Sequence, residues 1–423
     1  MADCVGDFRP AASDHSTGRR IMKRLWELDA ARGLMLVLMT ITHVPSRFTD
    51  PVGQPFGFVS AAEGFVLLSA FVSGLVYSRI GHAQGVDVMR RAFWRRALKI
   101  YLIQAALLLF VFTVITSVGL RVDHPEIKDM VRYYLAHPHD ALTYSLLLVY
   151  QPAFLDILPM YILFMLMSPW VIAFAMRRGW QWPMAVSATF WAVAQSGSTE
   201  WLYGVVSSML HLPVPYDETG SFDTFSWQFL WFVGMWMGAS RNEPDARPFT
   251  FPRWLVSAAV VVAVGCFCWR HFGPTGQAPF GDDQALNLLF DKWHLGPLRL
   301  VNLAALCIVA IRFGPPLLNR LPWRPRALED MGSASLPVFC AHLVAVFLVL
   351  SFVGRNNPAT SWTTDVLLLA VVFCGLYAVA WWVLRREEKQ RVRSAPATVT
   401  APAAIAASPS PAASSPARPA RRG

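Results

Sequence analysis

Long apolar runs recur along the chain and restrict it to a fold that buries helices in a bilayer. Ten such runs lie at residues 30–46, 57–78, 97–119, 141–176, 184–203, 226–240, 254–271, 298–313, 335–353 and 363–385. A membrane-crossing helix needs about 20 apolar residues. With 55% hydrophobic residues, the chain is predicted to be all-α, a polytopic integral membrane bundle of about ten transmembrane helices. The run at 141–176 is too long for one crossing and contains Pro152 and Pro159, so we expect a broken or re-entrant outer end there.

The distribution of positive charge indicates the orientation. Lys and Arg collect in the cytoplasmic loops of membrane proteins, and in a ten-helix topology they fall mainly on the side that holds both termini. Both termini are therefore predicted to be cytoplasmic, and the formal charge of +10 needs no nucleic acid to explain it. We expect a transmembrane domain at residues 25–388, between disordered cytoplasmic segments at residues 1–24 and in the Ala-, Pro- and Ser-rich tail at residues 389–423.

Several kinds of chemistry lack their sequence signatures. The six cysteines suggest neither disulfides nor a zinc site, and no metal is expected. The chain has no Gly-rich phosphate loop and no Gly-x-Ser-x-Gly turn, which argues against a nucleotide-hydrolysing motor and a serine hydrolase. His124 and Asp129 fit the His-x-x-x-x-Asp pattern of glycerolipid acyltransferases, but they fall in a predicted outer loop, away from any cytoplasmic donor.

The first apolar helix carries charged and titratable residues at both ends. Asp29 and Arg32 lie near its start and His43 at its end. Eleven residues separate Arg32 from His43, which is close to three helical turns and about 16 Å of rise, so both side chains leave the same face. A charged group inside a membrane span indicates function.

The second apolar helix adds Glu63, which the topology places about as deep from the outer surface as His43. A carboxylate beside an imidazole fixes its tautomer and raises its basicity, as a general base requires. A hydrogen-bonded interfacial histidine is the other interpretation of His43. Small residues also predict close packing of this helix on a neighbour: Ala62, Ser69, Ser73 and Gly74.

Residues 27–43, 54–74 and 331–342 together resemble the OpgC family, bacterial inner-membrane proteins associated with succinylation of osmoregulated periplasmic glucans. More distantly, the pattern is similar to the acyltransferase-3 superfamily of ten-helix membrane acyltransferases. Leu28, Asp29, Arg32 and His43 match the Leu-Asp-x-x-Arg motif and following histidine of that superfamily's first helix. The likeness covers roughly residues 25 to 385.

Three further motifs of the superfamily have counterparts here. Glu63 corresponds to an acidic residue of the second helix, although Ala70 replaces a glycine in the motif that follows. Arg95 and Arg96 resemble the basic start of its third helix, and His342 resembles a histidine of a late helix. A structural, hydrogen-bonded role is the alternative for His342.

The resemblance implies an acyltransferase that joins two compartments. An acyl-CoA, with succinyl-CoA as the expected co-substrate, would bind through its phosphates to Arg95 and Arg96 at the cytoplasmic mouth. The pantetheine arm would pass Arg32, with Asp29 beside it, and present the thioester to His43. There His43 would take the proton of a periplasmic glucan hydroxyl. Binding of membrane lipid head groups is the other interpretation of the basic cluster.

Outer loops contain aromatic and acidic residues that suit a sugar acceptor: Asp123, His124, Glu126, Arg132, Tyr133, Tyr134, His137, His139, Asp140, Tyr144, Tyr216, Asp217, Asp223, Trp227, Asp282, Asp283, Asp291, Trp293 and His294. Two other classes of function remain open. A transporter or flippase would line a substrate path with the same polar residues and transfer no acyl group. A structural membrane subunit would tolerate replacement of Arg32 and His43.

Overall fold

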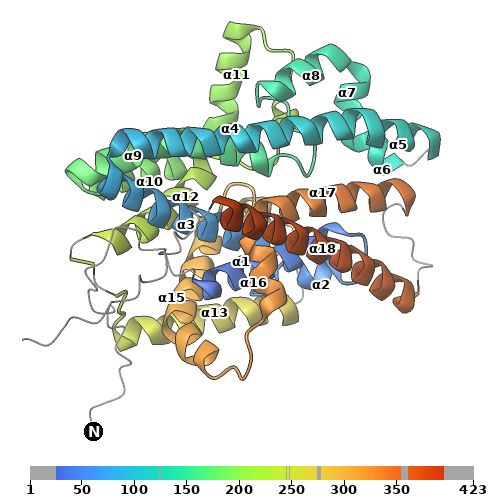
Figure 1. Cartoon of the computed structure of the whole chain (residues 1–423). Helices are drawn as coiled ribbons and strands as arrows, with labels where there is room; N and C mark the ends of the chain where they lie inside the picture. Colours follow the sequence, from blue (N-terminus) through green and yellow to red (C-terminus); the bar gives the residue numbers. More distant parts are fainter. Residues whose placement is uncertain are drawn as a thin grey trace, which may run out of the picture. The chain divides into compact units, whose positions relative to one another are not determined.

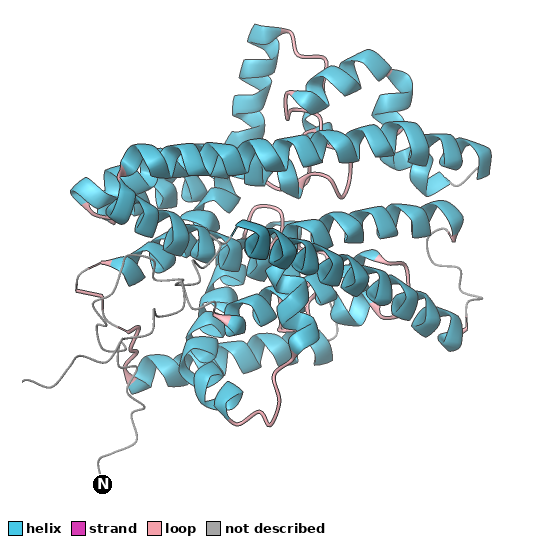
Figure 2. Ribbon diagram, in the orientation of Figure 1, coloured by secondary structure: helices cyan, strands magenta, loops and turns pink. Residues whose placement is uncertain are grey.

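Helices provide all the regular secondary structure of the described residues, as Figure 2 shows. The computed structural model describes residues 25–122, 125–243, 245–246, 248–273, 278–353 and 361–394, and these ranges contain no strand. The segment at residues 1–24 and most of the tail, both expected to be disordered, lie outside the described residues. One compact unit extends to Leu384. Of the second unit, residues 385–423, only residues 385–394 are described, and they are helical.

Seven helices of the described ranges are long and apolar enough to cross a membrane, so the chain has the character of a membrane protein. They are α3 (Ala61–Gln84), α4 (Val86–Phe110) continued through a π-helical turn (Val111–Ile115) into α5 (Thr116–Val122), α9 (Ile157–Arg178), α13 (Arg253–Phe272), α15 (Pro297–Asn319), α17 (Ser335–Phe352) and α18 (Trp362–Ser394). The number of ten and the cytoplasmic termini stay predictions.

The other three predicted spans correspond to elements outside this set: α1 (Trp26–His43), which is as long as α17 but carries Glu27, Asp29 and Arg32, α10 (Gln181–Ala194) followed by α11 (Ser198–Leu210), and α12 (Thr224–Ala239). The prediction of one helix at residues 184–203 is wrong, because Gly197 has a positive φ of 75° between α10 and α11. Such a backbone conformation is open to glycine and interrupts a helix.

Short helices connect the long ones (Figure 1): α2 (Thr49–Gly53), α6 (Pro125–Met130), α7 (Arg132–Ala136), α8 (Pro138–Leu146), α14 (Gln284–Asn287) and α16 (Arg326–Ser333), with 3-10 turns at Tyr216–Glu218, Ser240–Asn242 and Leu288–Phe290. The long run at 141–176 divides as expected into α8, an irregular stretch that holds Pro152, and α9. Pro159 lies in the first turn of α9, where a helix does not need its missing N–H.

Close helix packing joins α3 to several other helices. α3 packs extensively on α12 and also contacts α1 and α4. A methyl group added to Gly74 would collide with the carbonyl of Met235, and one added to Gly238 with the carbonyl of Phe71. The predicted close approach of the second apolar helix to a neighbour is therefore confirmed, and the neighbour is α12.

Candidate active site

A pair of histidines joins α1 to α17. Nδ1 of His43 lies 3.0 Å from Nε2 of His342, and the two rings stack with centroids 5.1 Å apart. Pro45 disfavours a helical conformation at Val44, which is extended, so α1 ends at His43 and leaves the imidazole at the helix terminus. Because Nδ1 faces His342, Nε2 is the ring nitrogen of His43 that remains for a substrate.

His43 lines a cavity of about 580 Å³, a volume within the range of small-molecule sites. The walls come from the end of α1, residues 49–62, the start of α9 and the loops before α12 and α15. His342 is fully buried and is not among the residues that line this cavity. The two predicted histidines therefore have different positions. His43 lines the cavity, and His342 contacts the ring of His43 without lining the cavity.

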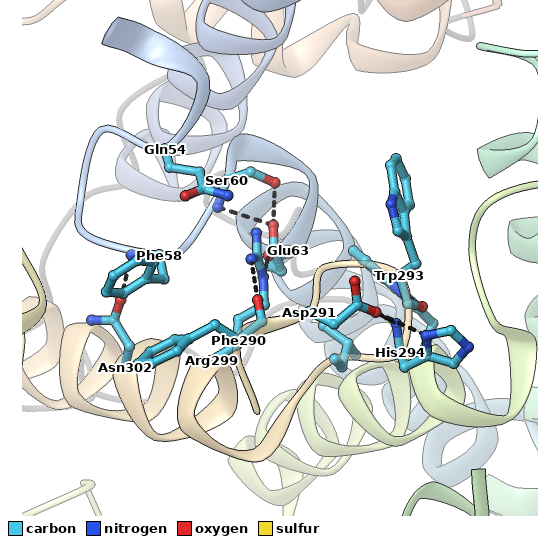
Figure 3. A network of polar contacts seen from close by, with 12 residues as sticks. Gln54, Phe58, Ser60, Glu63, Phe290, Asp291, Trp293, His294, Arg299 and Asn302 are labelled. Carbon is cyan, nitrogen blue, oxygen red and sulfur yellow. Dashed lines mark hydrogen bonds and ion pairs between the residues drawn. The ribbon is translucent and has the colours of Figure 1, made fainter. Parts of the chain in front are cut away.

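The predicted pairing of Glu63 with His43 is wrong, because Glu63 pairs with Arg299 instead. Its Oε1 lies 2.5 Å from Nε of Arg299, and its other oxygen accepts hydrogen bonds from the backbone N–H and the hydroxyl of Ser60 (Figure 3). Glu63 and Arg299 are both fully buried. Ser60 and Glu63 form the capping box that begins α3, so the carboxylate is committed to its own helix end and to α15.

Arg299 is a site residue that the sequence pattern hides. It lies in the first turn of α15, after Gly296 and Pro297, and looks like one more loop cation in the sequence. Besides Glu63, its guanidinium donates to the carbonyl of Phe290 over 2.9 Å. A local signal could have indicated the direction of the Glu63 carboxylate: the Ser-x-x-Glu spacing of Ser60 and Glu63 is typical of a capping box.

The loop before α15 brings three polar residues to the site. Asp291 accepts a hydrogen bond from the backbone N–H of His294 over 2.7 Å and contacts Nδ1 of the same residue at 2.8 Å (Figure 3). This hydrogen bond raises the pKa of the His294 imidazole, against the effect of burial. Burial lowers the pKa of the Lys292 amine as well, while the charge of Glu63 partly restores it.

A second, small cavity of about 30 Å³ holds the predicted donor residues Arg32 and Arg96. Arg32 donates a hydrogen bond to the hydroxyl of Ser335 on α17, and its guanidinium lies 3.8 Å from the carboxylate of Asp29. Asp29 in turn accepts a hydrogen bond from Ser333 over 3.0 Å. Asp29 is therefore a residue that holds Arg32 in place, between α1 and the start of α17.

The structure separates the two arginines at the start of the third apolar helix. Arg96 is partly buried and lines the small cavity, whereas Arg95 is exposed and its Nε donates to the carbonyl of Arg91 over 3.2 Å. They are adjacent in sequence and so point about 100° apart on a helix. Only Arg96 joins Arg32.

The predicted single conduit from Arg32 to His43 is divided in this structure. Arg32 lines the small cavity and His43 the large one, and Ile157 and Phe339 line both. Phe339 is 3% exposed and its ring stacks against Phe65 at 5.9 Å. The same face of α1 thus reaches two cavities that meet at an apolar partition.

The structure brings some residues of the predicted outer loops together and places others elsewhere. A third cavity of about 550 Å³ is lined by Tyr216, Asp217, Asp223, Trp293 and His294 from the predicted acceptor set. It shares Ser221, Phe222 and Trp293 with the cavity of His43.

Other members of the predicted acceptor set lie elsewhere. Trp227 is fully buried and its indole donates to the carbonyl of Trp293, which is a structural role. Tyr133 donates to the carbonyl of Pro213. Asp123 and His124 lie outside the described residues, so the His-x-x-x-x-Asp pattern has no structural test. Within the described ranges, no group of three or more His, Cys, Asp or Glu residues is placed to hold a metal ion.

These features define a class: a helical membrane protein in which a paired histidine lines a cavity next to a smaller cavity that two arginines line. The family model described as OpgC protein matches residues 24–388, and the chain belongs to that family. A search of curated proteins and a search of solved structures found no match.

Proposed function

We propose that this protein is a membrane O-acyltransferase that moves a succinyl group from succinyl-CoA to hydroxyl groups of a periplasmic glucan. Membership of the OpgC family supports this class of transferase. The observation that carries the proposal is the hydrogen-bonded pair of His43 and His342 beside a cavity large enough for sugar and acyl groups. The corresponding location is the inner membrane of a bacterium.

The histidine pair accounts for activation of the acceptor. If Nδ1 of His43 carries the proton and donates a hydrogen bond to Nε2 of His342, then Nε2 of His43 has a free lone pair. That nitrogen takes the proton of a glucan hydroxyl as the oxygen attacks the thioester carbonyl. The resulting tetrahedral intermediate collapses, the carbon–sulfur bond breaks, and His43 returns the proton to the departing thiolate. The products are an acylated glucan and CoA.

The two cations that line the smaller cavity suit the phosphates of the donor, and this cavity of about 30 Å³ would have to open to admit any part of CoA. CoA carries several phosphate charges, and Arg96, one of the two cations that line this cavity, lies toward the predicted cytoplasmic side of α4. Arg32, about three turns before His43 on the same face of α1, also lines this cavity, and Asp29 and Ser335 hold its guanidinium. The thin pantetheine arm would then have to pass Ile157 and Phe339 to bring the thioester to His43.

Mass spectrometry of periplasmic glucans tests the proposal. Glucans from a deletion strain would be compared with those from the same strain carrying the wild-type chain or the His43→Ala variant. We expect an added mass of succinyl only with the wild type, because general-base catalysis contributes roughly 10² to 10⁴ in rate. The variant should reach the membrane at the wild-type level, measured by immunoblot.

Two results would contradict the proposal. Glucans of unchanged mass in all three strains, with a changed amount of glucan in the periplasm, would indicate a transporter or flippase. Normal acylation by the His43→Ala variant would remove His43 from the chemistry.

A further inference from the structure

One cation in the cavity of His43 has no ion-pair partner among the described residues. Lys292 lines that cavity, and no described carboxylate oxygen lies within ion-pair distance of its amine. The amine instead lies 4.5 Å from the ring centroid of Trp293 and 5.8 Å from that of Phe222. Aromatic faces attract a cation, but they do not neutralise its charge.

Two neighbouring charged residues have side-chain partners, although Nη2 of Arg299 has no hydrogen-bond partner among the described residues. Arg299 is paired with Glu63, and Asp291 is held by two contacts from His294 (Figure 3). Lys292 therefore differs from the other buried charges around it.

Asp50 and Asp156 also line this cavity, and Asp156 accepts the backbone N–H of Ser221 over 3.1 Å. Its attraction for Lys292 acts without an ion pair. The cavity thus presents one ammonium group whose hydrogen bonds are open to a ligand.

A half-buried ammonium of this kind favours an anion. Burial lowers the pKa of Lys292, which means that the charged amine has lost hydration. A carboxylate that enters the cavity replaces that hydration with a charge-assisted hydrogen bond, which is stronger than one between neutral groups. An alkyl chain of the same length offers no such compensation.

We propose that Lys292 binds the free carboxylate of a dicarboxylic acyl group while the thioester carbonyl of that group lies at His43. Both side chains line one cavity of about 580 Å³, which is ample for a four-carbon acyl chain. Lys292 then selects a succinyl group over a neutral acyl group of equal length. This inference rests on the proposed acyltransferase function, which supplies the acyl group that is recognised.

Paired donors test the selectivity. The full-length protein, purified in detergent, would be assayed with glucan from the deletion strain and with either succinyl-CoA or butyryl-CoA, whose acyl chain has the same length but no carboxylate. For Lys292→Met we expect kcat/KM to fall about 10- to 100-fold with succinyl-CoA and to stay within about threefold with butyryl-CoA. Lys292→Arg should retain a preference for succinyl-CoA.

The control is Lys128→Met, which removes a lysine of α6 that is not among the residues lining the cavity of His43. This variant should leave kcat/KM unchanged with both donors. An equal fall in kcat/KM with both donors for Lys292→Met would overturn the inference. It would indicate that Lys292 stabilises the oxyanion or is needed for folding. Unchanged selectivity would overturn it as well. A wild-type protein that consumes neither donor would instead overturn the proposed function on which the inference rests.

Discussion

Replacing His342 with leucine isolates the contribution of the histidine pair. The substitution removes the ring nitrogen that lies 3.0 Å from Nδ1 of His43, the acceptor in the proposed mechanism, and places an apolar side chain at a fully buried position. A buried donor left without a partner costs about 1–3 kcal/mol. Since 1.36 kcal/mol corresponds to a tenfold change in rate, kcat should fall about 5- to 150-fold.

The loss should lie in kcat, because His342 is not among the residues that line the cavity. His342→Gln provides the matched variant, since its amide oxygen can accept the same hydrogen bond. We expect the glutamine variant to recover most of the activity, and both variants to keep KM for the glucan within about twofold. The assay is steady-state release of CoA by purified protein, with thermal unfolding in detergent as the check on folding.

Two results would refute this reasoning. A leucine variant with wild-type kcat would show that the pair does not position His43. A glutamine variant no better than leucine, with both folded, would show that His342 does more than accept a hydrogen bond.

The remaining predictions concern other parts of the site and its scaffold. Glu63→Gln should lower the free energy of unfolding by about 3–5 kcal/mol, because it leaves a buried guanidinium unpaired; a denaturant titration that shows no loss would contradict this. Arg96→Glu should raise KM for acyl-CoA far more than Arg95→Glu, because only the former lines the small cavity; equal effects would indicate lipid binding. Gly238→Ala should destabilise the protein by about 1–3 kcal/mol, whereas the control Gly265→Ala, in open space, should have little effect on thermal unfolding.

The helical class and much of the helix placement could be predicted because they depend on local sequence. Apolar runs and their length identify helices that suit a bilayer, and the period of the α-helix places Arg32 and His43 on one face. The break inside residues 184–203 also had a local signal, the Ser-Gly-Ser sequence around Gly197. The expectation of a continuous helix gave this turn signal too little weight.

Partners of the site residues could not be predicted, because they come from distant segments. His342 is 299 positions from His43, and Arg299 is 236 positions from Glu63. Matching depth in the membrane suggested that His43 and Glu63 would meet, but depth does not fix the direction in which a side chain points. Helix packing does, and it gives Glu63 a guanidinium and His43 a second imidazole.

The partition between the two cavities depends on packing in the same way. Phe339 lies one turn before His342 on α17, and nothing in the sequence distinguishes it from the other apolar residues of that helix. Phe339 and Ile157 line both cavities, so the proposed donor arm would have to pass them. The route proposed for the thioester therefore requires this ring to move.

Vectorial transfer in sealed proteoliposomes tests the central claim most directly. Glucan would be enclosed in the vesicles, and succinyl-CoA with a labelled succinyl group would be added outside. We predict labelled glucan inside the vesicles, CoA released outside in equal amount, and neither product with His43→Ala. Labelled glucan that forms only when donor and acceptor share one compartment would contradict the proposal that His43 receives an acyl group passed through the bundle.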